Sequence, residues 1–249
     1  MEIHRINHDT ATEGHGVVVV IDVIRAFSVA AYAFAGGARE LWLVRQVEEA
    51  LALREREPLA LLAGEVNGRQ IPGFDFSNSP AEMARAQVQG HLIIQRTGAG
   101  TRGAVSAVNA AQLLVGSLVN ARATAAYAGR LAEETGKVIF LYPTATIPDE
   151  DGFPNEDDFC ADYIAALLLQ SPDADTVLSG QIELLRRAGR FEFFMRGYPD
   201  CPAEDVPAVL DINRFAFAMV GTRHLWNGID YVSIRRVDGT QTIPGRPEP

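Results

Sequence analysis

The sequence predicts an α/β fold in three layers, with helices on both sides of a largely parallel or mixed sheet. Short apolar runs of strand length alternate with helix-like stretches along the first half of the chain. Several runs are apolar throughout, as in parallel strands that are buried on both faces. With 249 residues, 47% of them hydrophobic, the chain can bury a large core. We expect a single α/β domain over residues 1–249, within which a boundary between two lobes cannot be placed.

The first element is a strand over residues 17–21, a β-branched run that Asp22 closes. An Ala-rich helix is expected next, over residues 25–35, because Gly36 and Gly37 follow it as a helix end. Further strands are expected at residues 41–44, 59–63, 91–95 and 137–142, and helices at residues 47–55, 81–87, 121–134 and 159–169.

The net charge of −10 constrains the partners. Thirty-two acidic residues face 22 lysines and arginines, so the global field repels polyanions and a nucleic-acid partner is not expected. A small anionic substrate is compatible with this charge only where arginines, backbone N–H groups or a divalent cation gather locally.

The cysteine pattern predicts a reducing compartment. Cys160 and Cys201 stand far apart and match neither a disulfide framework nor a zinc-site spacing. Residues 1–16 contain no apolar signal-peptide core, and no uninterrupted apolar run approaches the roughly 20 residues that span a bilayer. We therefore expect a cytoplasmic protein without a membrane segment.

Ligand sites in α/β folds gather beyond the carboxyl ends of the strands, so polar residues there are the first candidates for chemistry. Asp22 leaves the first strand, and Arg25 follows three residues later at the start of a helix. The carboxylate suits a hard cation, and the planar guanidinium suits a phosphate or sulfonate. The alternative is a structural one, in which Asp22 caps the helix and Arg25 lies at the surface.

A second candidate combines Gly64-Glu65 with the turn-rich loop at residues 71–80. Glu65 and Asp75 are candidates to hold a metal and its water, and Asn78 and Ser79 to donate to an anion. In the structural alternative, Ser79 is an ordinary N-cap that is followed by Pro80 at the first helical position.

A third candidate is the glycine-rich loop at residues 96–103, which lies between a strand and an Ala-rich helix. Its glycines let backbone N–H groups approach a phosphate closely, and the helix dipole adds to the positive potential. The substrate-binding candidates in this loop are Thr97, Gly98, Gly100, Thr101 and Arg102. The loop also fits the dinucleotide fingerprint G-x-G-x-x-G, although no acidic residue follows between residues 104 and 132.

Acidic residues at 149–151 and 156–158 form a fourth group, which precedes and opens an apolar helix. Glu156 and Asp157 are candidates to complete a magnesium site. A solvated first helical turn that complements the macrodipole is the alternative.

Taken in order, five motifs resemble the 2-phosphosulfolactate phosphatase family. They are Asp22-Val-Ile-Arg25-Ala26, Gly64-Glu65, Gly73-Phe74-Asp75-x-x-Asn78-Ser79-Pro80, Gly100-Thr101-Arg102 and Glu156-Asp157-x-x-Cys160-Ala161. The stretch at residues 210–215 is also similar. The resemblance implies an α/β fold, a magnesium requirement and hydrolysis of 2-phosphosulfolactate to sulfolactate and phosphate, a step in coenzyme M synthesis. One departure is Ala99, which stands where family members often carry an asparagine.

The resulting hypothesis is a Mg²⁺-dependent phosphatase of a small anionic phosphomonoester, with a homodimer as the candidate assembly. The expected catalytic residues are Asp22, Arg25, Glu65 and Asp75, and the expected metal ligands are Asp22, Glu65, Asp75, Glu156 and Asp157. Whether Asp22 acts as a nucleophile or serves the metal stays open. Two rival functions also stay open, a Rossmann-like oxidoreductase and a non-catalytic anion-binding protein.

Overall fold

The computed structural model describes residues 1–145 and 155–239, so the predicted acidic cluster at residues 149–151 lies outside the described residues. Ten strands are described: β1 Ile3–Arg5, β2 Val17–Ile21, β3 Glu40–Val44, β4 Leu61–Val66, β5 Arg69–Gln70, β6 Leu92–Arg96, β7 Gln112–Gly116, β8 Ile139–Pro143, β9 Phe217–Trp226 and β10 Ile229–Asp238. The described α-helices are α1 Ala26–Ala35, α2 Val47–Arg56, α3 Pro80–Met83, α4 Gly100–Ser106, α5 Ala121–Thr135, α6 Glu156–Leu168, α7 Ala174–Arg187 and α8 Asp205–Val209.

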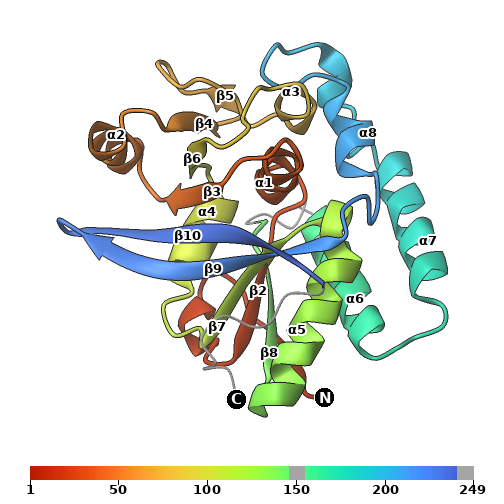
Figure 1. Cartoon of the computed structure of the whole chain (residues 1–249). Coiled ribbons are helices and arrows are strands. Elements are labelled where there is room, and N and C mark those ends of the chain that lie inside the picture. The colour runs from red at the N-terminus through yellow and green to blue at the C-terminus, as the bar shows by residue number, and fades with distance from the viewer. Residues whose placement is uncertain (146–154, 240–249) are drawn as a thin grey trace.

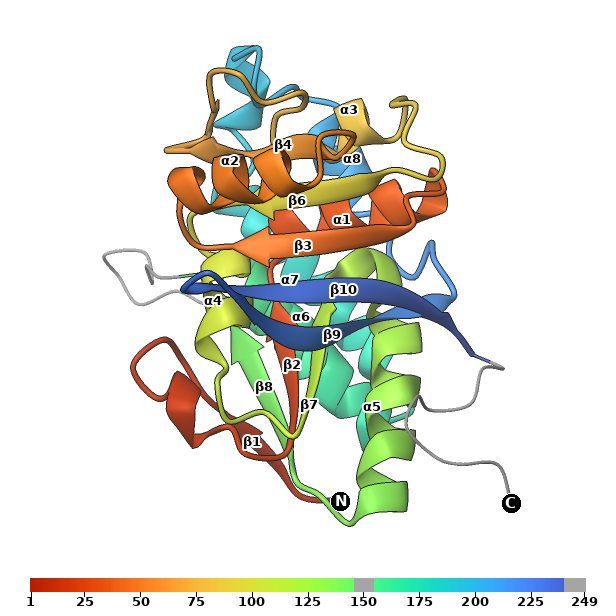
Figure 2. The same cartoon turned by 60° about the vertical axis from the view of Figure 1, so that its left-hand side comes forward.

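The strands form one continuous mixed sheet in the order β1-β8-β2-β7-β9-β10-β3-β6-β4-β5. β1, β8, β2 and β7 are parallel neighbours, and so are β3, β6 and β4. The antiparallel hairpin β9–β10 joins the two parallel groups, because β9 pairs with β7 and β10 pairs with β3. Figure 2 shows this hairpin between the two groups, with β3 and β6 running across the direction of β2.

Helices cover both faces of the sheet, which confirms the predicted layered α/β class (Figure 1). Successive residues of β2 point to opposite faces, so Val18 and Val20 pack with α1 and α4, whereas Val19 and Ile21 pack with α5 and α6. All five residues of β2 are buried, as a strand between two helical layers requires. α2 packs on β3 and β6, toward the end of the sheet that β5 forms.

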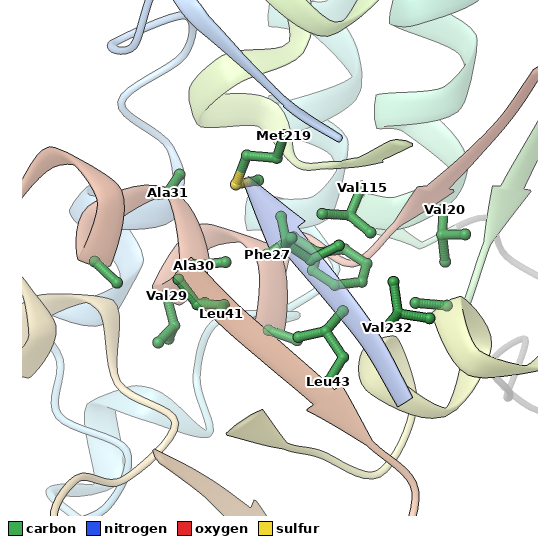
Figure 3. Packing of buried hydrophobic residues seen from close by; sticks show 14 of the residues in the cluster. Val20, Phe27, Val29, Ala30, Ala31, Leu41, Leu43, Val115, Met219 and Val232 are labelled. Carbon is green, nitrogen blue, oxygen red and sulfur yellow. The ribbon is translucent and has the colours of Figure 1, made fainter. Parts of the chain in front are cut away.

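The largest apolar cluster lies between α1 and the middle of the sheet. Figure 3 shows the Phe27 ring of α1 among Val115 of β7, Leu43 of β3 and Val232 of β10. Phe27 thus contacts strands of both parallel groups and of the hairpin between them. This packing holds α1, and with it the turn after β2, against the centre of the sheet.

Several predicted boundaries shift in the structure for local reasons. β4 runs to Val66, beyond the predicted end at residue 63, because Glu65 and Val66 pair with β5 in a short antiparallel hairpin. α6 begins at Glu156, three residues earlier than predicted, because the Asn155 side chain accepts hydrogen bonds from the N–H groups of Asp157 and Asp158. The predicted helix at residues 81–87 is shortened to α3.

Membrane insertion was not expected from the sequence. Within residues 1–145 and 155–239, none of the helices has the length and apolarity needed to cross a membrane.

Candidate active site

A cavity of about 240 Å³ lies where β2, β4 and β6 end. Asp22 follows β2, Glu65 is the penultimate residue of β4, and Thr97 follows β6; all three line the cavity. Arg25 and Asn78, also predicted from the sequence, line it as well. The structure therefore brings together five of the predicted site residues, which come from three motifs that are far apart along the chain.

Asp22 lines this cavity and is only 5% exposed. Its Oδ1 accepts a hydrogen bond from the N–H of Ala26 at 3.0 Å, and the N–H of Gly100 also donates to the carboxylate. Burial is the main cause that raises the pKa of Asp22 to about 7, and the charges of Glu156 and Glu65 also raise it. The two hydrogen bonds act in the opposite direction and lower the pKa. A buried carboxylate in this state is suited to bind a cation or to exchange a proton near neutral pH.

The close approach between Asp22 and the glycine-rich loop depends on Gly100. A Cβ at this position would lie 2.5 Å from Asp22 Oδ2 and 2.7 Å from the Cβ of Ala26. Both distances are shorter than any van der Waals contact, so residue 100 needs to be glycine for the loop to reach Asp22.

Arg25 is buried beside the cavity, and its orientation is fixed by Asp205. Its Nη1 donates to Asp205 Oδ2 at 2.7 Å and to the carbonyl oxygen of Asp200 at 2.6 Å. The Asp205 side chain is 1% exposed, and its Oδ1 accepts hydrogen bonds from Ser79 Oγ at 2.5 Å and from the N–H of Ala81. The surface alternative for Arg25 is therefore wrong, because the side chain is held in a buried ion pair.

Glu65 also lines the cavity, and two backbone N–H groups hold its carboxylate. Oε1 accepts from Gly98 at 2.6 Å, and Oε2 accepts from Gly68 at 2.8 Å. The N–H groups of Gly98 and Gly100 are thus both used by carboxylates of the chain itself. The loop that was expected to surround a phosphate instead positions Glu65 and Asp22.

Thr97 lines the cavity, and the residues that follow it in the loop pack at the start of α4. The N–H of Thr97 donates to Thr101 Oγ1, and the N–H of Thr101 donates to Thr97 Oγ1. These two hydrogen bonds join the loop to the first turn of α4. Thr101 also donates to the carbonyl of Val44 and is fully buried. Arg102 is exposed and does not line the cavity.

Asn78 and Ser79 have different surroundings although they are neighbours. Asn78 is 5% exposed, and among the described residues its Oδ1 has no hydrogen-bond partner. Ser79 Oγ accepts from the N–H of Glu82, which is the N-cap geometry of the structural alternative, while it donates to Asp205. Asn78 therefore presents an unused acceptor near the cavity, and Ser79 acts through Asp205.

Asp75 is not brought to the other carboxylates. Its Oδ2 accepts from the N–H of Leu62 at 2.7 Å and from Arg54 Nη1 at 3.0 Å. Leu62 precedes Glu65 by three residues on β4, so the anchor point of Asp75 lies about 10 Å along the strand from Glu65. Residues 75 and 76 lie beside the middle of β4, where Phe76 pairs with Ala63 in a parallel bridge.

Glu156 and Asp157 approach the cavity from the start of α6 without lining it. Glu156 is paired with Arg190 through two contacts of 2.8 and 3.1 Å. Asp157 accepts from the N–H groups of Val23 at 2.7 Å and Ala145 at 3.0 Å. Burial, followed by the charges of Asp22 and Glu156, raises the pKa of Asp157 well above its usual value.

The predicted five-carboxylate metal site does not assemble as one group. Across the described ranges, no cluster of three or more histidine, cysteine, aspartate or glutamate side chains is arranged to hold a metal ion. The carboxylates of Asp22 and Glu65, together with Asn78 Oδ1, still provide oxygen atoms around the cavity. Mg²⁺ usually takes only one or two carboxylates and completes its shell with water and substrate oxygen atoms, so these donors fit it.

Sequence reasoning missed the cavity wall that comes from residues 190–205. Phe193, Phe194 and Cys201 line the cavity, and Arg25 lies over the Phe194 ring at 5.7 Å. None of these residues belongs to a recognisable motif. Only the Pro202-Ala203-Glu204-Asp205 helix start offered a signal, and that signal indicates a cap, not a site.

Comparisons with known proteins identify the same family that the motifs resemble. The model of the 2-phosphosulpholactate phosphatase family matches residues 3–186. Proteins named probable 2-phosphosulfolactate phosphatase are 41% identical in Bacillus subtilis (strain 168) over 150 residues and 37% identical in Deinococcus radiodurans over 192 residues. A third, from Carboxydothermus hydrogenoformans, is 39% identical over 153 residues.

The matched regions differ in extent. They cover 60%, 74% and 61% of this chain, and 63%, 76% and 60% of the Bacillus, Deinococcus and Carboxydothermus proteins respectively. The chain thus spans less than two thirds of the Bacillus and Carboxydothermus relatives. The family match includes Asp22, Arg25, Glu65 and Asn78, and it ends before Asp205. The chain belongs to the 2-phosphosulfolactate phosphatase family.

Proposed function

We propose that this protein is a magnesium-dependent phosphatase that hydrolyses 2-phosphosulfolactate to sulfolactate and phosphate, the type of step used in coenzyme M synthesis. The observation that carries the proposal is that Asp22 and Arg25, from one strand-to-helix turn, line the same cavity as Glu65 and Asn78. The names of the relatives supply the substrate class.

In the proposed reaction a water oxygen attacks phosphorus, and the bond from phosphorus to the C2 oxygen of the substrate breaks. The guanidinium of Arg25, oriented by Asp205, binds an oxygen of the phosphoryl or sulfonate group. One of the two carboxylates at the cavity, Asp22 or Glu65, takes the proton that the attacking water releases. The proton that the alkoxide leaving group needs is available from solvent.

Magnesium would be held by the carboxylates of Asp22 and Glu65 with the oxygen of Asn78. The support is chemical: these are hard oxygen donors, two of them charged, and the third is a buried acceptor without a partner. A bound Mg²⁺ would supply charge neutralisation for the phosphoryl oxygens in the transition state. It would also offset the repulsion between a polyanionic substrate and the two carboxylates at the cavity.

No observation favours the dinucleotide-dependent oxidoreductase. The backbone N–H groups of Gly98 and Gly100, which would hold a pyrophosphate in that function, donate to Glu65 and Asp22. A phosphate would have to displace a carboxylate to reach them.

The proposal includes a reducing cytoplasm and leaves a homodimer as the candidate assembly. Cys160 and Cys201 are both free and buried, which supports a compartment where thiols stay reduced.

The test is phosphate release from a panel of 2-phosphorylated acids that includes 2-phosphosulfolactate and 2-phospholactate, with Mg²⁺ or with excess chelator. We expect turnover of the sulfonate compound that chelation abolishes and added Mg²⁺ restores. Undiminished turnover in excess chelator would contradict the magnesium requirement. Binding without release across the panel would favour the non-catalytic anion-binding alternative.

A further inference from the structure

A second cavity, of about 320 Å³, lies on the side of the sheet that α5 covers. Its walls are α5, the segment at residues 213–216 that leads into β9, and the paired ends of β9 and β10. It shares no lining residue with the candidate active site. Its volume falls within the range of about 300–1,000 Å³ that small-molecule sites occupy.

Most of the wall is apolar. Ala123 and Ala126 of α5 face Phe215, Ala218 and Val237, and Ala218 and Val237 are opposite each other in the β9–β10 pairing. The small alanine side chains on α5 leave the space open. A hydrocarbon body of modest size could therefore replace water there and bury apolar surface.

Arg130 supplies a polar group with unused donors at this cavity. Its Nη1 donates to the carbonyl oxygen of Gly239 at 3.2 Å. Its Nε and Nη2 are buried, and within the described part of the chain neither has a hydrogen-bond partner. These two N–H groups form one edge of the guanidinium and point in the same direction, which is the arrangement that a carboxylate accepts with both oxygens.

Tyr127 provides a second unsatisfied polar group at this cavity. The residue lines the cavity and is 3% exposed, yet its Oη has no partner among residues 1–145 and 155–239. Burial raises the pKa of Tyr127, so the phenol stays protonated and able to donate. Arg130 lies over the Tyr127 ring, 4.9 Å from its centroid, so the two unsatisfied groups adjoin each other.

The local charge indicates one negative charge on the ligand. Arg122 also lines the cavity, but its Nη2 already donates to both oxygens of Asp175 and to Tyr163 Oη. Arg130 lies in the C-terminal part of α5, where the helix dipole disfavours anions, and Glu134 follows one turn later. A phosphate dianion is thus a poorer match than a monoanion with a planar head.

We propose that this second cavity binds a small organic carboxylate, with its apolar body between α5 and the β9–β10 strands and its carboxylate on the Nε–Nη2 edge of Arg130. The Tyr127 hydroxyl donates to the same head group. This site is separate from the proposed phosphatase reaction, and its ligand differs from that substrate by carrying an apolar body and a single charge.

Hexanoate and benzoate serve as probes, and calorimetric titration of the full chain measures their binding. We expect saturable binding with one site per chain and a dissociation constant of about 1 mM or lower. Hexan-1-ol, which lacks the charge, and inorganic phosphate, which lacks the apolar body, should each bind at least about tenfold more weakly at this site.

Two variants locate the binding. Arg130→Gln removes the charged edge, and Ala126→Leu fills the cavity from an exposed helical position where leucine is well tolerated. Each should weaken hexanoate binding at least about tenfold, while Arg187→Gln, at an exposed arginine on α7, should leave it unchanged. Thermal melts check that all three variants are folded.

The proposal is overturned if neither carboxylate binds saturably to the wild type, or if Arg130→Gln and Ala126→Leu both bind hexanoate like the wild type. Because the readout is binding of a compound without phosphorus, a failed phosphatase assay would not affect this result. Equally, a failure here would leave the phosphatase proposal intact.

Discussion

The buried ion pair of Arg25 and Asp205 fixes the position of the Arg25 guanidinium at a cavity that is otherwise acidic. The two side chains are 5% and 1% exposed, and Asp205 receives two further hydrogen bonds, from Ser79 and Ala81. An arginine without this partner would be drawn toward Asp22 and Glu65. With Nη1 fixed on Asp205, the other donors of the guanidinium can face a substrate.

Removing Asp205 should therefore affect both stability and turnover. Asp205→Ala leaves the Arg25 charge buried and unpaired, so we expect a loss of about 3–5 kcal/mol in the free energy of unfolding, measured in urea. Asp175→Ala is the matched control, because it breaks an arginine pair whose carboxylate is 71% exposed and should cost less than about 1 kcal/mol. Equal losses in the free energy of unfolding for the two substitutions would show that the buried pair stabilises the protein no more than the exposed pair does.

Asp22 is the residue on which the proposed reaction depends most. Asp22→Asn keeps the volume but removes the charge that binds Mg²⁺ or takes the proton. We expect phosphate release to fall at least about 100-fold in a folded protein. Asp75→Asn is the informative comparison: Asp75 is held by Leu62 and Arg54 away from the cavity, so kcat should change little. A folded Asp22→Asn variant with normal turnover would reduce Asp22 to a helix cap.

The sequence predicted which side chains line the cavity better than it predicted the residues that those side chains contact. Asp22, Arg25, Glu65, Asn78 and Thr97 meet at one cavity because each stands at a strand end or in the loop that follows. Asp75 stays apart because it lies beside the middle of β4, where the N–H of Leu62 donates to its side chain. Asp205 could not be found, because its distance from Arg25 along the chain hides a contact that only the tertiary fold creates.

Among the elements, the glycine-rich loop and α4 depend on close packing against α1. Gly100→Ala places a methyl group against Asp22 and the Cβ of Ala26, which is part of a helix and cannot yield easily. We expect a stability loss of about 1–3 kcal/mol in urea unfolding, together with reduced turnover, because the N–H of Gly100 moves away from Asp22.

Gly180→Ala is the matched control for that substitution. Gly180 lies within α7, and nothing lies within 4 Å of the added Cβ. Alanine there should stabilise the protein by about 0.5–1 kcal/mol through helix propensity and leave turnover unchanged. A Gly100→Ala variant that behaved like Gly180→Ala would contradict the tight contact with Asp22.

Most elements with a continuous apolar pattern were predicted, although the apolar strand β7 was missed, and elements defined by pairing were not predicted. β2 was predicted residue for residue, because five consecutive β-branched residues are typical of a buried parallel strand. β9 and β10 were missed, since glycine, arginine and histidine interrupt the apolar pattern of β9. Asn227-Gly228, both with positive φ, was the available signal, because this dipeptide favours a tight hairpin turn.

At the scale of the whole molecule, the β9–β10 hairpin makes one sheet from two parallel groups. The twist across this hairpin lets the carboxyl ends of β2 and of β4 and β6 meet, although the two groups run in opposite directions. This arrangement brings several carboxylates close together at the strand ends of a protein that already carries a net charge of −10. The burial of these carboxylates, followed by their mutual repulsion, should lower the free energy of unfolding when they are charged.

In the absence of magnesium, the burial of the Asp22 carboxylate, together with the repulsion from Glu156 and Glu65, should make the protein less stable as the pH rises. The pKa of Asp22 is about 7 in the folded protein against 3.8 in the reference state, so between these values the folded state binds more protons than the unfolded state. The free energy of unfolding then falls with increasing pH through this window, by roughly 2–3 kcal/mol between pH 5 and pH 8. Asp157, whose pKa is raised as well, contributes in the same direction.

The measurement is urea unfolding in chelator at pH 5 and pH 8, for the wild type and for Asp22→Asn. The lowered pKa of His224 acts in the opposite direction but equally in both proteins, so it cancels in the comparison. We expect the wild type to lose clearly more stability than the variant between the two pH values. Mg²⁺ at pH 8 should restore stability to the wild type and much less to Asp22→Asn, because a bound cation replaces the proton. Parallel pH dependence in the two proteins would exclude Asp22 as the group that titrates.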